Sequence, residues 1–277
     1  MKKRILALGV IVLFALLAPW PVSAREYTEV FHSGKIDWLH GVAETTVTTM
    51  LSAKHLRSDR ARAKAANEAL ESARQSLLDL VGRIKIDSRT SIKDLLSRAE
   101  TLRDRLQELV RNLPVQGIHY RGKGRVDLSL AIPLSGALSE LVLPQDIRTI
   151  DSVYQPRIPT QATDQEFTGL VVDCPGVSAR PAMVPKIFDE DGQLVYGAPY
   201  ISREYAVKLG VAGYFRDVQA AQSDERVGPK PLTVKGIKTA ATGPSDLTIS
   251  NSDAARIRGT ASNLKWLQRC KVLIVLE

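Results

Sequence analysis

The stretch AANEALESARQSLLDLV, residues 65–81, decides the fold of the first half of the chain. Its apolar residues recur at steps of three and four, which is the spacing of one face of an α-helix. They are Ala66, Ala69, Leu70, Ala73, Leu77, Leu80 and Val81. We expect this helix to begin near Ser58 and to end at Gly82, with its alanines close to a neighbouring element.

A second apolar stripe predicts another helix, from Ile92 to Val110. Ser88, Thr90 or Ser91 could serve as its N-cap, because a short polar side chain there accepts a hydrogen bond from the first turn. Pro114 lies beyond the expected end of the helix, where a proline commonly follows.

Strand-like segments, which alternate between polar and apolar residues or are rich in Val and Thr, surround these helices. They are residues 35–49, 83–87, 115–120 and 125–132. Residues 121–124, Arg-Gly-Lys-Gly, predict a hairpin turn, and residues 137–143 predict a short helix. The first domain, residues 25–143, is therefore expected to be a mainly antiparallel sheet with two helices packed on one face.

The second half of the chain is predicted to form a separate domain, residues 167–277, after a linker over residues 144–166. A linker is expected because three prolines lie there among Gln and Thr residues and the hydrophobic periodicity fades. Strand-like segments follow at 167–174, 186–189, 193–196, 232–238, 247–250 and 272–276.

Three further patterns refine this second domain. Ser250 and Asp253 form a capping-box pattern that opens a helix through Ile257, and residues 214–222 also favour a helix. The closing run 272–276, Val-Leu-Ile-Val-Leu, is apolar at every position, which predicts a strand buried on both faces inside the sheet. The expected fold class is α+β, with two small domains, the second being a mixed sheet with short helices.

The N-terminus has the pattern of a secretory signal peptide over residues 1–24. Residues 2–4 are basic, residues 5–17 form an unbroken apolar run, and small residues lead to a cleavage site after Ala24. A transmembrane anchor is the alternative, but a span needs about 20 apolar residues and this run is shorter. We expect a periplasmic protein that loses its signal peptide and has no transmembrane span in the mature chain.

The composition is that of a folded globular protein, with 44% hydrophobic and 25% charged residues among 277. This balance excludes a disordered or collagen-like chain. The formal net charge is +8, and it falls to +5 when the three cations of the signal peptide are removed. A mildly basic exported protein favours weak contact with an anionic surface of the envelope, and export argues against nucleic acid as a partner.

Cys174 and Cys270 are the only cysteines in the sequence, which excludes a cysteine-rich zinc site. Two alternatives stay open for them. An exported compartment permits a disulfide, which would close a loop of about a hundred residues and stabilise the fold by about 4–5 kcal/mol. Two buried thiols that pack without bonding are the other alternative.

No catalytic or cofactor-binding motif stands out. His32, His40, His55 and His119 lack the spacing of a zinc-protease motif, and a glycine-rich phosphate loop is absent from the sequence. Residues 262–265 match Ser-x-x-Lys without the partner motifs of penicillin-interacting enzymes. We expect no enzyme, no metal and no cofactor. The alternative is a cell-envelope hydrolase with an unrecognised site, which His40, His119 and an acid in one cleft would favour.

A dense positive cluster marks the region where the first helix is expected to begin. It consists of Lys54, His55, Arg57, Arg60, Arg62 and Lys64. The N-terminus of a helix attracts anions, so the cluster is a candidate surface for phosphate or for the carboxylates of a partner. The alternative is a solvated face on which Asp59 and Glu68 act as local counter-ions.

The first domain resembles the Lpp-twenty lipoprotein family and the N-terminal domain of flagellar assembly protein T. The resemblance rests on the order of strand, two helices and paired strands, and on residues 65–70, 117–120 and 124–130 within it. It implies a small α/β module of the bacterial periplasm with no known chemistry. Members called lipoproteins have an acylated cysteine where this chain has Arg25, which indicates a protein that is soluble in the periplasm or loosely associated.

The second half is similar to uncharacterised exported bacterial proteins, on residues 168–173, 182–187, 189–192 and 195–197. That resemblance implies no particular function. We therefore expect a non-catalytic periplasmic or cell-envelope binding or assembly protein that acts through protein–protein contacts with other envelope proteins. The resemblance of the first domain implies flagellar or outer-membrane association.

Overall fold

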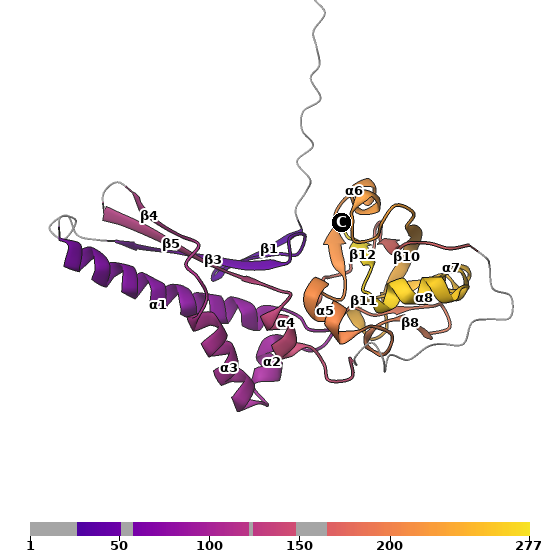
Figure 1. Ribbon diagram of the computed structural model, residues 1–277, viewed down its shortest axis with the longest axis horizontal. Coiled ribbons are helices and arrows are strands. Elements are labelled where there is room, and N and C mark those ends of the chain that lie inside the picture. Colours follow the sequence, from indigo (N-terminus) through magenta and orange to yellow (C-terminus); the bar gives the residue numbers. More distant parts are fainter. Residues whose placement is uncertain (1–26, 51–57, 122–123, 148–164) are drawn as a thin grey trace, which may run out of the picture.

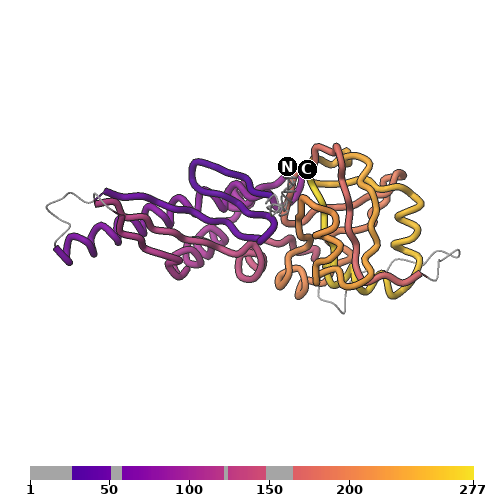
Figure 2. Tube along the Cα trace, turned by 90° about the horizontal axis from the view of Figure 1, so that it is seen from above, coloured from indigo at the N-terminus to yellow at the C-terminus, as the bar shows by residue number. Residues whose placement is uncertain are grey.

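The computed structural model describes residues 27–50, 58–121, 124–147 and 165–277. The chain forms two lobes that lie end to end along the long axis of the molecule (Figures 1 and 2). A five-stranded antiparallel sheet with helices builds the first lobe, and a seven-stranded mixed sheet with short helices builds the second. The predicted α+β class is confirmed. The expected signal peptide and most of the expected linker lie outside the described residues.

The sheet of the first lobe has the strand order β1-β2-β3-β5-β4, and every pairing in it is antiparallel. Its strands are β1 (Thr28–Phe31), β2 (Gly34–Asp37), β3 (Val42–Met50), β4 (Gly117–Arg121) and β5 (Arg125–Pro133). β3 and β5 pair along their full length. On one face of the sheet β5 buries Val126, Leu128, Leu130 and Ile132, as the alternation in its sequence predicts.

The long helix α1 (Asp59–Arg83) covers that face (Figure 1). Ser58 is its N-cap, and the Ser58 hydroxyl accepts a hydrogen bond from the backbone N–H of Ala61. The buried face of α1 consists of Ala65, Ala69, Ala73, Leu77, Leu80, Val81 and Gly82. The predicted stripe is confirmed at Ala69, Ala73, Leu77, Leu80 and Val81, whereas Ala66 and Leu70 are only half-buried and Ala65 is buried instead. The small residues let the helix approach the sheet, with Ala65 packed on Val126.

The prediction of one helix from Ile92 to Val110 is wrong, because the chain forms two helices there. They are α2 (Ile92–Leu96) and α3 (Glu100–Arg111). The break comes at Ala99, whose backbone is extended, with φ −143° and ψ 93°. The change of direction lets both helices contact α1 (Figure 1). Ile92 from α2 and Leu106 from α3 are buried in the same core as a result.

Ser91 caps α2 through a reciprocal pair of hydrogen bonds, and Ser91→Ala is expected to lower the free energy of unfolding by about 1 kcal/mol. The Ser91 hydroxyl accepts from the backbone N–H of Asp94 (3.2 Å), and the Asp94 carboxylate accepts from the backbone N–H of Ser91 (2.8 Å). Urea denaturation followed by circular dichroism measures the change. Ser97→Ala is the control, because that hydroxyl donates only to the carbonyl of Asp94. An equal loss in both variants would contradict the capping role.

Residues 35–49 do not form the single predicted strand. They form β2 and β3 with a tight turn between them. The carboxylate of Asp37 accepts a hydrogen bond from the backbone N–H of His40 (3.0 Å), and Gly41 takes a left-handed conformation with φ 62°. This turn places His40 at the junction of the two lobes.

The sheet of the second lobe has the strand order β8-β7-β11-β10-β6-β12-β9. Its strands are β6 (Leu170–Asp173), β7 (Ile187–Phe188), β8 (Leu194–Tyr196), β9 (Gly213–Phe215), β10 (Leu232–Ala240), β11 (Gly243–Ile249) and β12 (Val272–Val275). Strands β10, β6, β12 and β9 are parallel, whereas β10 with β11 and β7 with β8 are antiparallel. All residues of β12 are buried between β6 and β9, which confirms its predicted interior position.

Short helices connect the later elements. They are α4 (Ala137–Val142), η3 (Ala198–Tyr200), α5 (Arg203–Leu209), α6 (Val218–Ser223), α7 (Asn251–Arg258) and α8 (Ala261–Gln268). The predicted cap of α7 is confirmed, because the Ser250 hydroxyl accepts from the backbone N–H of Asp253 (3.0 Å). The helix predicted over 214–222 is wrong at its start. Tyr214 belongs to β9, and α6 begins only after its N-cap Asp217.

The strand predicted over residues 83–87 is wrong, because Arg83 ends α1 and residues 84–87 instead link the two lobes. Apart from one isolated bridge they join no sheet. The carbonyl of Lys85 accepts a hydrogen bond from the backbone N–H of Met183 (2.9 Å), and the carbonyl of Ile86 accepts one from Val184 (2.7 Å). The partner of this extended segment is therefore a loop almost a hundred residues further along the chain.

Side chains complete the junction between the lobes. The rings of Trp38 and Tyr214 meet edge to face, with their centroids 5.6 Å apart. The guanidinium of Arg203 donates to the Glu140 carboxylate (Nη2–Oε1, 3.3 Å) and to its backbone carbonyl (3.0 Å). Buried apolar residues from both sheets belong to one continuous core. The lobes thus form one body rather than two freely hinged domains.

Candidate functional site

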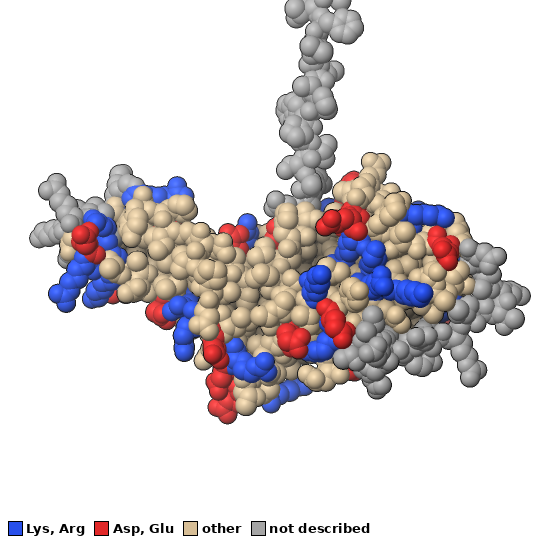
Figure 3. Space-filling view, in the orientation of Figure 1, with Lys and Arg blue, Asp and Glu red and all other residues tan. Residues whose placement is uncertain are grey.

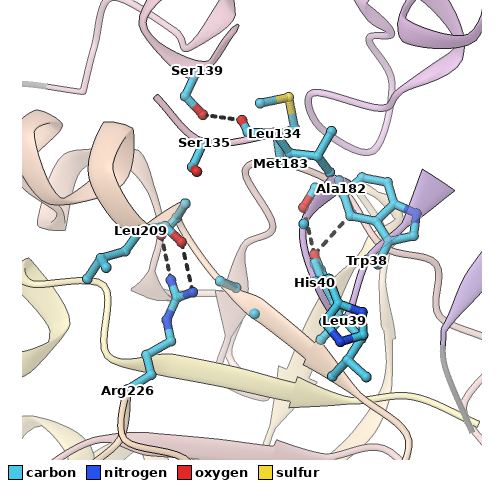
Figure 4. Close-up of a pocket in the computed structure, with 15 residues that line it drawn as sticks. Trp38, Leu39, His40, Leu134, Ser135, Ser139, Ala182, Met183, Leu209 and Arg226 are labelled. Atoms are coloured by element: carbon cyan, nitrogen blue, oxygen red, sulfur yellow. Dashed lines mark hydrogen bonds between the residues drawn. The ribbon is translucent and has the colours of Figure 1, made fainter. Parts of the chain in front are cut away.

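A cavity of about 140 Å³ lies at the junction of the two lobes (Figure 4). The turn after β2 and the segment before α4 line it from the first lobe, and the segment from the end of α5 to β9 lines it from the second. Its lining residues are Trp38, Leu39, His40, Gly41, Leu134, Ser135, Ser139, Ala182, Met183, Leu209, Gly210, Ala212, Gly213, Tyr214 and Arg226. Small molecules commonly bind in such hollows between packed units.

Arg226 carries the positive charge of this cavity. Its guanidinium donates three hydrogen bonds to backbone carbonyls: Nε to Cys270 (2.8 Å), Nη1 to Leu209 (2.9 Å) and Nη2 to Gly210 (2.5 Å). Figure 4 shows the guanidinium directed at the carbonyls that end α5. Burial lowers the pKa of Arg226 from its usual value, but an arginine stays protonated in proteins. The site therefore holds a largely buried cation.

His40 is held in one orientation by Asp37. Nδ1 of His40 lies 2.7 Å from Oδ2 of Asp37, so the second ring nitrogen is left for other contacts. Asp37 is buried, whereas the His40 side chain is 62% exposed and stands at the rim of the cavity. Among the described residues no hydroxyl or thiol is hydrogen-bonded to His40, so a nucleophile–base pair is not formed there.

The second histidine of interest lies elsewhere. His119 is on β4, opposite Asp127 on β5, at the exposed edge of the first sheet. His40 and His119 therefore do not meet in one cleft. In the part of the chain that the structure describes, no group of three His, Cys, Asp or Glu side chains is placed to hold a metal ion. The arrangement that would favour an envelope hydrolase is not found in that part.

The Ser-x-x-Lys pattern lies on the first turns of α8. The Ser262 hydroxyl donates a hydrogen bond to the Glu166 carboxylate (2.7 Å) rather than pairing with Lys265. A nucleophilic serine needs an amine or imidazole within hydrogen-bond reach. The pattern does not build such a pair here.

Cys174 and Cys270 are buried free thiols, so the disulfide that the sequence left open is not formed. The register of the sheet explains why. β6 and β12 are parallel neighbours, with Leu170 opposite Val272. Cys174 follows the end of β6, whereas Cys270 precedes the start of β12. Six residue positions separate them along the strands, about 20 Å, which is far beyond the reach of a disulfide.

Burial raises the pKa of both thiols. It raises the pKa of Cys174 to about 12, with a further contribution from the Asp173 carboxylate. It raises the pKa of Cys270 to about 11, although the nearby Arg226 acts in the opposite direction. A reactive cysteine needs a lowered pKa. Both thiols therefore act as small apolar core groups.

The basic cluster predicted at the start of α1 is described in part. Lys54, His55 and Arg57 lie outside the described residues. Arg60, Arg62 and Lys64 lie on the first turns of α1. Figure 3 shows cations gathered at this end of the first lobe, far from the junction with the second.

Two of these cations have acidic partners on α1 itself. Arg62 forms an ion pair with Asp59, and Nζ of Lys64 lies 3.8 Å from a carboxylate oxygen of Glu68. These are the local counter-ions of a solvated helix face. The Ser58 cap also satisfies one of the free N–H groups that an anion would bind.

The open edge of the first sheet is a second candidate surface. β4 is the last strand in its sheet, so the outer backbone groups of β4 pair with no other strand among the described residues. Ile118 is 40% exposed and Tyr120 is 54% exposed, and Val115 just before the strand is exposed as well. Apolar side chains along an unpaired edge mark a contact site for another chain.

The opposite face of the β4–β5 hairpin is polar. Arg121 and Arg125 both form ion pairs with Asp127, and the Thr48 hydroxyl donates to the same carboxylate (2.8 Å). The Thr48 hydroxyl and the two arginines hold the pKa of Asp127 below its usual value. One carboxylate thus balances two guanidinium groups, which leaves the tip of the hairpin positive.

Nothing in the sequence around Arg226 points to a cavity. Arg226 lies among other charged residues in the segment 224–226, Asp-Glu-Arg. Its three carbonyl partners are 16, 17 and 44 residues away along the chain. Contacts of this kind leave no periodic signal, so only the folded chain brings the cation to the lobe junction.

No helix among the described residues is both long and apolar enough to cross a bilayer.

Comparison with known proteins bears on the second lobe. No curated protein matches the chain. Residues 169–277, which contain the whole seven-stranded sheet, match a family model described as Treponema pallidum Tp0624, second domain. The second lobe of this bacterial protein is therefore similar to the second domain of that Treponema protein.

Proposed function

We propose that this chain is a non-catalytic binding or assembly protein of the bacterial cell envelope, which acts through protein–protein contacts. Its contact site is the edge of β4, and the partner is an extended, acidic segment of another envelope protein that adds a strand there. The observation that carries this proposal is the unpaired edge of β4 with its exposed apolar side chains. Strand addition to a free sheet edge is a common mode of peptide recognition.

The exposed side chains of Ile118 and Tyr120 lie on the face of the sheet that α1 covers, but α1 does not extend over them. Ile118 is opposite Leu128 and Tyr120 is opposite Val126, so they share the face on which α1 packs. Leu128 and Val126 are fully buried there, whereas Ile118 and Tyr120 remain exposed. α1 packs mainly across β2, β3 and β5. A partner strand beside β4 would continue this face and cover both side chains.

The charges near this edge favour an acidic partner. β4 itself contains no acid, and it ends at Arg121 beside Arg125. The first turns of α1, with Arg60, lie at the same end of the lobe, since Ala65 of α1 packs on Val126 of β5. Attraction to several guanidinium groups would orient an acidic strand and raise its rate of association.

The envelope location follows from the export signal expected over residues 1–24 and is part of the proposal. A flagellar or outer-membrane setting is what the resemblance of the first domain implies. The edge of β4 could bind a partner strand without either location. The two locations indicate in which part of the cell the partner should be sought.

Photo-cross-linking in living cells tests the proposal. A photoreactive amino acid replaces Ile118 or Tyr120, and the adducts are identified by mass spectrometry. We expect both positions to give an adduct with another envelope protein, through an extended segment rich in Asp and Glu. Met50 is the matched control, because it is 66% exposed on the same sheet but points to the opposite face, opposite Arg125.

Several outcomes would overturn the proposal. Adducts of equal yield at Met50 would mean that the edge is not selective. An adduct of twice the mass of the chain would identify a second copy as the occupant instead. Absence of any adduct at positions 118 and 120, in cells where the protein is folded and exported, would exclude a stable partner at this edge.

A further inference from the structure

We propose that the cavity between the two lobes binds a short-chain organic acid, whose carboxylate is held by the guanidinium of Arg226. This site is separate from the edge of β4 and does not depend on a protein partner. Three properties of the cavity carry the inference: a cation with free donors, the absence of a carboxylate from the described lining, and a partly apolar wall around a volume of suitable size.

Two of the N–H groups of the Arg226 guanidinium are not used in its hydrogen bonds to backbone carbonyls. An arginine has five N–H groups, and three of them are used by the carbonyls of Leu209, Gly210 and Cys270. Those three bonds fix the plane of the guanidinium without neutralising its charge. Two N–H groups remain, one on each terminal nitrogen, and either can donate a charge-assisted hydrogen bond to a carboxylate oxygen.

The charge of Arg226 is not balanced within the site. None of the described residues that line the cavity is Asp or Glu. The neighbouring acid Asp224 accepts from the backbone N–H of Arg226 (2.9 Å) and forms no ion pair with its guanidinium. The nearby charge of Asp224 acts on Arg226, but the hydrogen-bond acceptors of its guanidinium are all neutral carbonyls. A largely buried cation of this kind gains more from an anion than an exposed cation does.

The remaining walls describe the rest of the ligand. Trp38, Met183 and Tyr214 supply apolar surface, and the Ser135 hydroxyl adds a polar group (Figure 4). The volume of about 140 Å³ is close to that of a cavity which holds one benzene molecule, so about six non-hydrogen atoms fit. A carboxylate with a chain of three or four carbons meets both the charge and the volume.

Nuclear magnetic resonance of the purified protein tests this inference with sodium butyrate as the probe. Gly41, Gly210 and Gly213 line the cavity, so their backbone amides report on it, whereas Gly117 and Gly192 do not belong to its lining. We expect butyrate to shift the first three signals in a saturable manner, with a dissociation constant of about 1 mM. Butyramide has the same shape without the charge, and we expect it to bind at least about ten-fold more weakly. Sodium chloride at equal ionic strength corrects for screening.

A variant that fills the cavity provides the second measurement. Ala212→Leu places a larger side chain in the lining and leaves the carbonyl partners of Arg226 unchanged. We expect this variant to lose the butyrate shifts while the signals of Gly117 and Gly192 stay at their native positions. If the variant does not fold, the difference in affinity between butyrate and butyramide for the unmodified protein still tests the inference.

The inference fails if butyrate gives no saturable shift at the cavity glycines, or if butyramide shifts them equally. Equal shifts at Gly117 and Gly192 would mean general salt effects rather than a site. Any of these results would leave Arg226 as a structural tie between α5 and the start of β12.

Discussion

Raising the pH from 9 to 11 is expected to lower the free energy of unfolding by about 4 kcal/mol through the two cysteines alone. In the folded protein burial raises the pKa of Cys174 to about 12 and that of Cys270 to about 11. In the unfolded chain both thiols ionise near pH 9. A group whose pKa is raised by folding stabilises the fold below its unfolded pKa and loses that contribution as the pH rises. The thiols of the unfolded chain therefore release protons that the folded protein retains.

Urea denaturation at several pH values measures this dependence. Cys174→Ala combined with Cys270→Ala is the matched control, because it removes both thiols and keeps the sheet. We expect the control to be less stable near neutral pH but to lose less stability between pH 9 and 11. Titration of the thiols should find two in the unfolded protein and none that react rapidly in the native one. An identical pH slope in both proteins would contradict this account.

Replacing Tyr214 by phenylalanine is expected to lower the free energy of unfolding by about 2–4 kcal/mol. The Tyr214 hydroxyl accepts from the backbone N–H of Ala182 (3.0 Å) and donates to the carbonyl of the same residue (2.7 Å). Both residues are buried, so removing one oxygen leaves two main-chain groups without a partner. The ring itself stays, so the edge-to-face contact with Trp38 is kept.

Chemical denaturation of the unmodified protein and of the Tyr214→Phe variant tests this prediction. Tyr205→Phe is the control, because Tyr205 is only half-buried and its ring is held by a cation–π contact with Arg269, which phenylalanine retains. We expect the control to change stability by less than about 0.5 kcal/mol. We also expect one cooperative transition for the whole protein, because both sheets share a core. Two separate transitions in the unmodified protein would show that the junction does not couple the lobes.

The shared core also bears on how the protein binds. A clamp that closes on its ligand needs a hinge with few contacts. Here Lys85 and Ile86 pair with a loop of the second lobe, and Trp38 contacts Tyr214. The cavity is therefore formed before any ligand arrives, and the edge of β4 is held at a fixed distance from it. Preformed sites of this kind bind without a large ordering cost.

The elements that follow from the sequence are those with a local cause. The stripe in residues 65–81 predicts α1, and the short polar residues Ser58 and Ser250 predict where two helices begin. For α2 the sequence leaves three candidate caps, of which Ser91 is the one used. The run 272–276 predicts a strand inside the sheet. Helical faces, caps and buried strands depend on residues within a few positions of one another, so the order of residues is enough to identify them.

The break between α2 and α3, the role of residues 83–87 and the cavity around Arg226 were decided by tertiary structure. Each depends on partners far along the chain: the break serves packing on α1, Lys85 meets Met183, and Arg226 meets the carbonyl of Cys270. The same holds for the two cysteines, whose separation follows from the parallel register of β6 and β12. Local patterns determine which segments become helices and strands, whereas the packing of distant segments determines what those elements bring together.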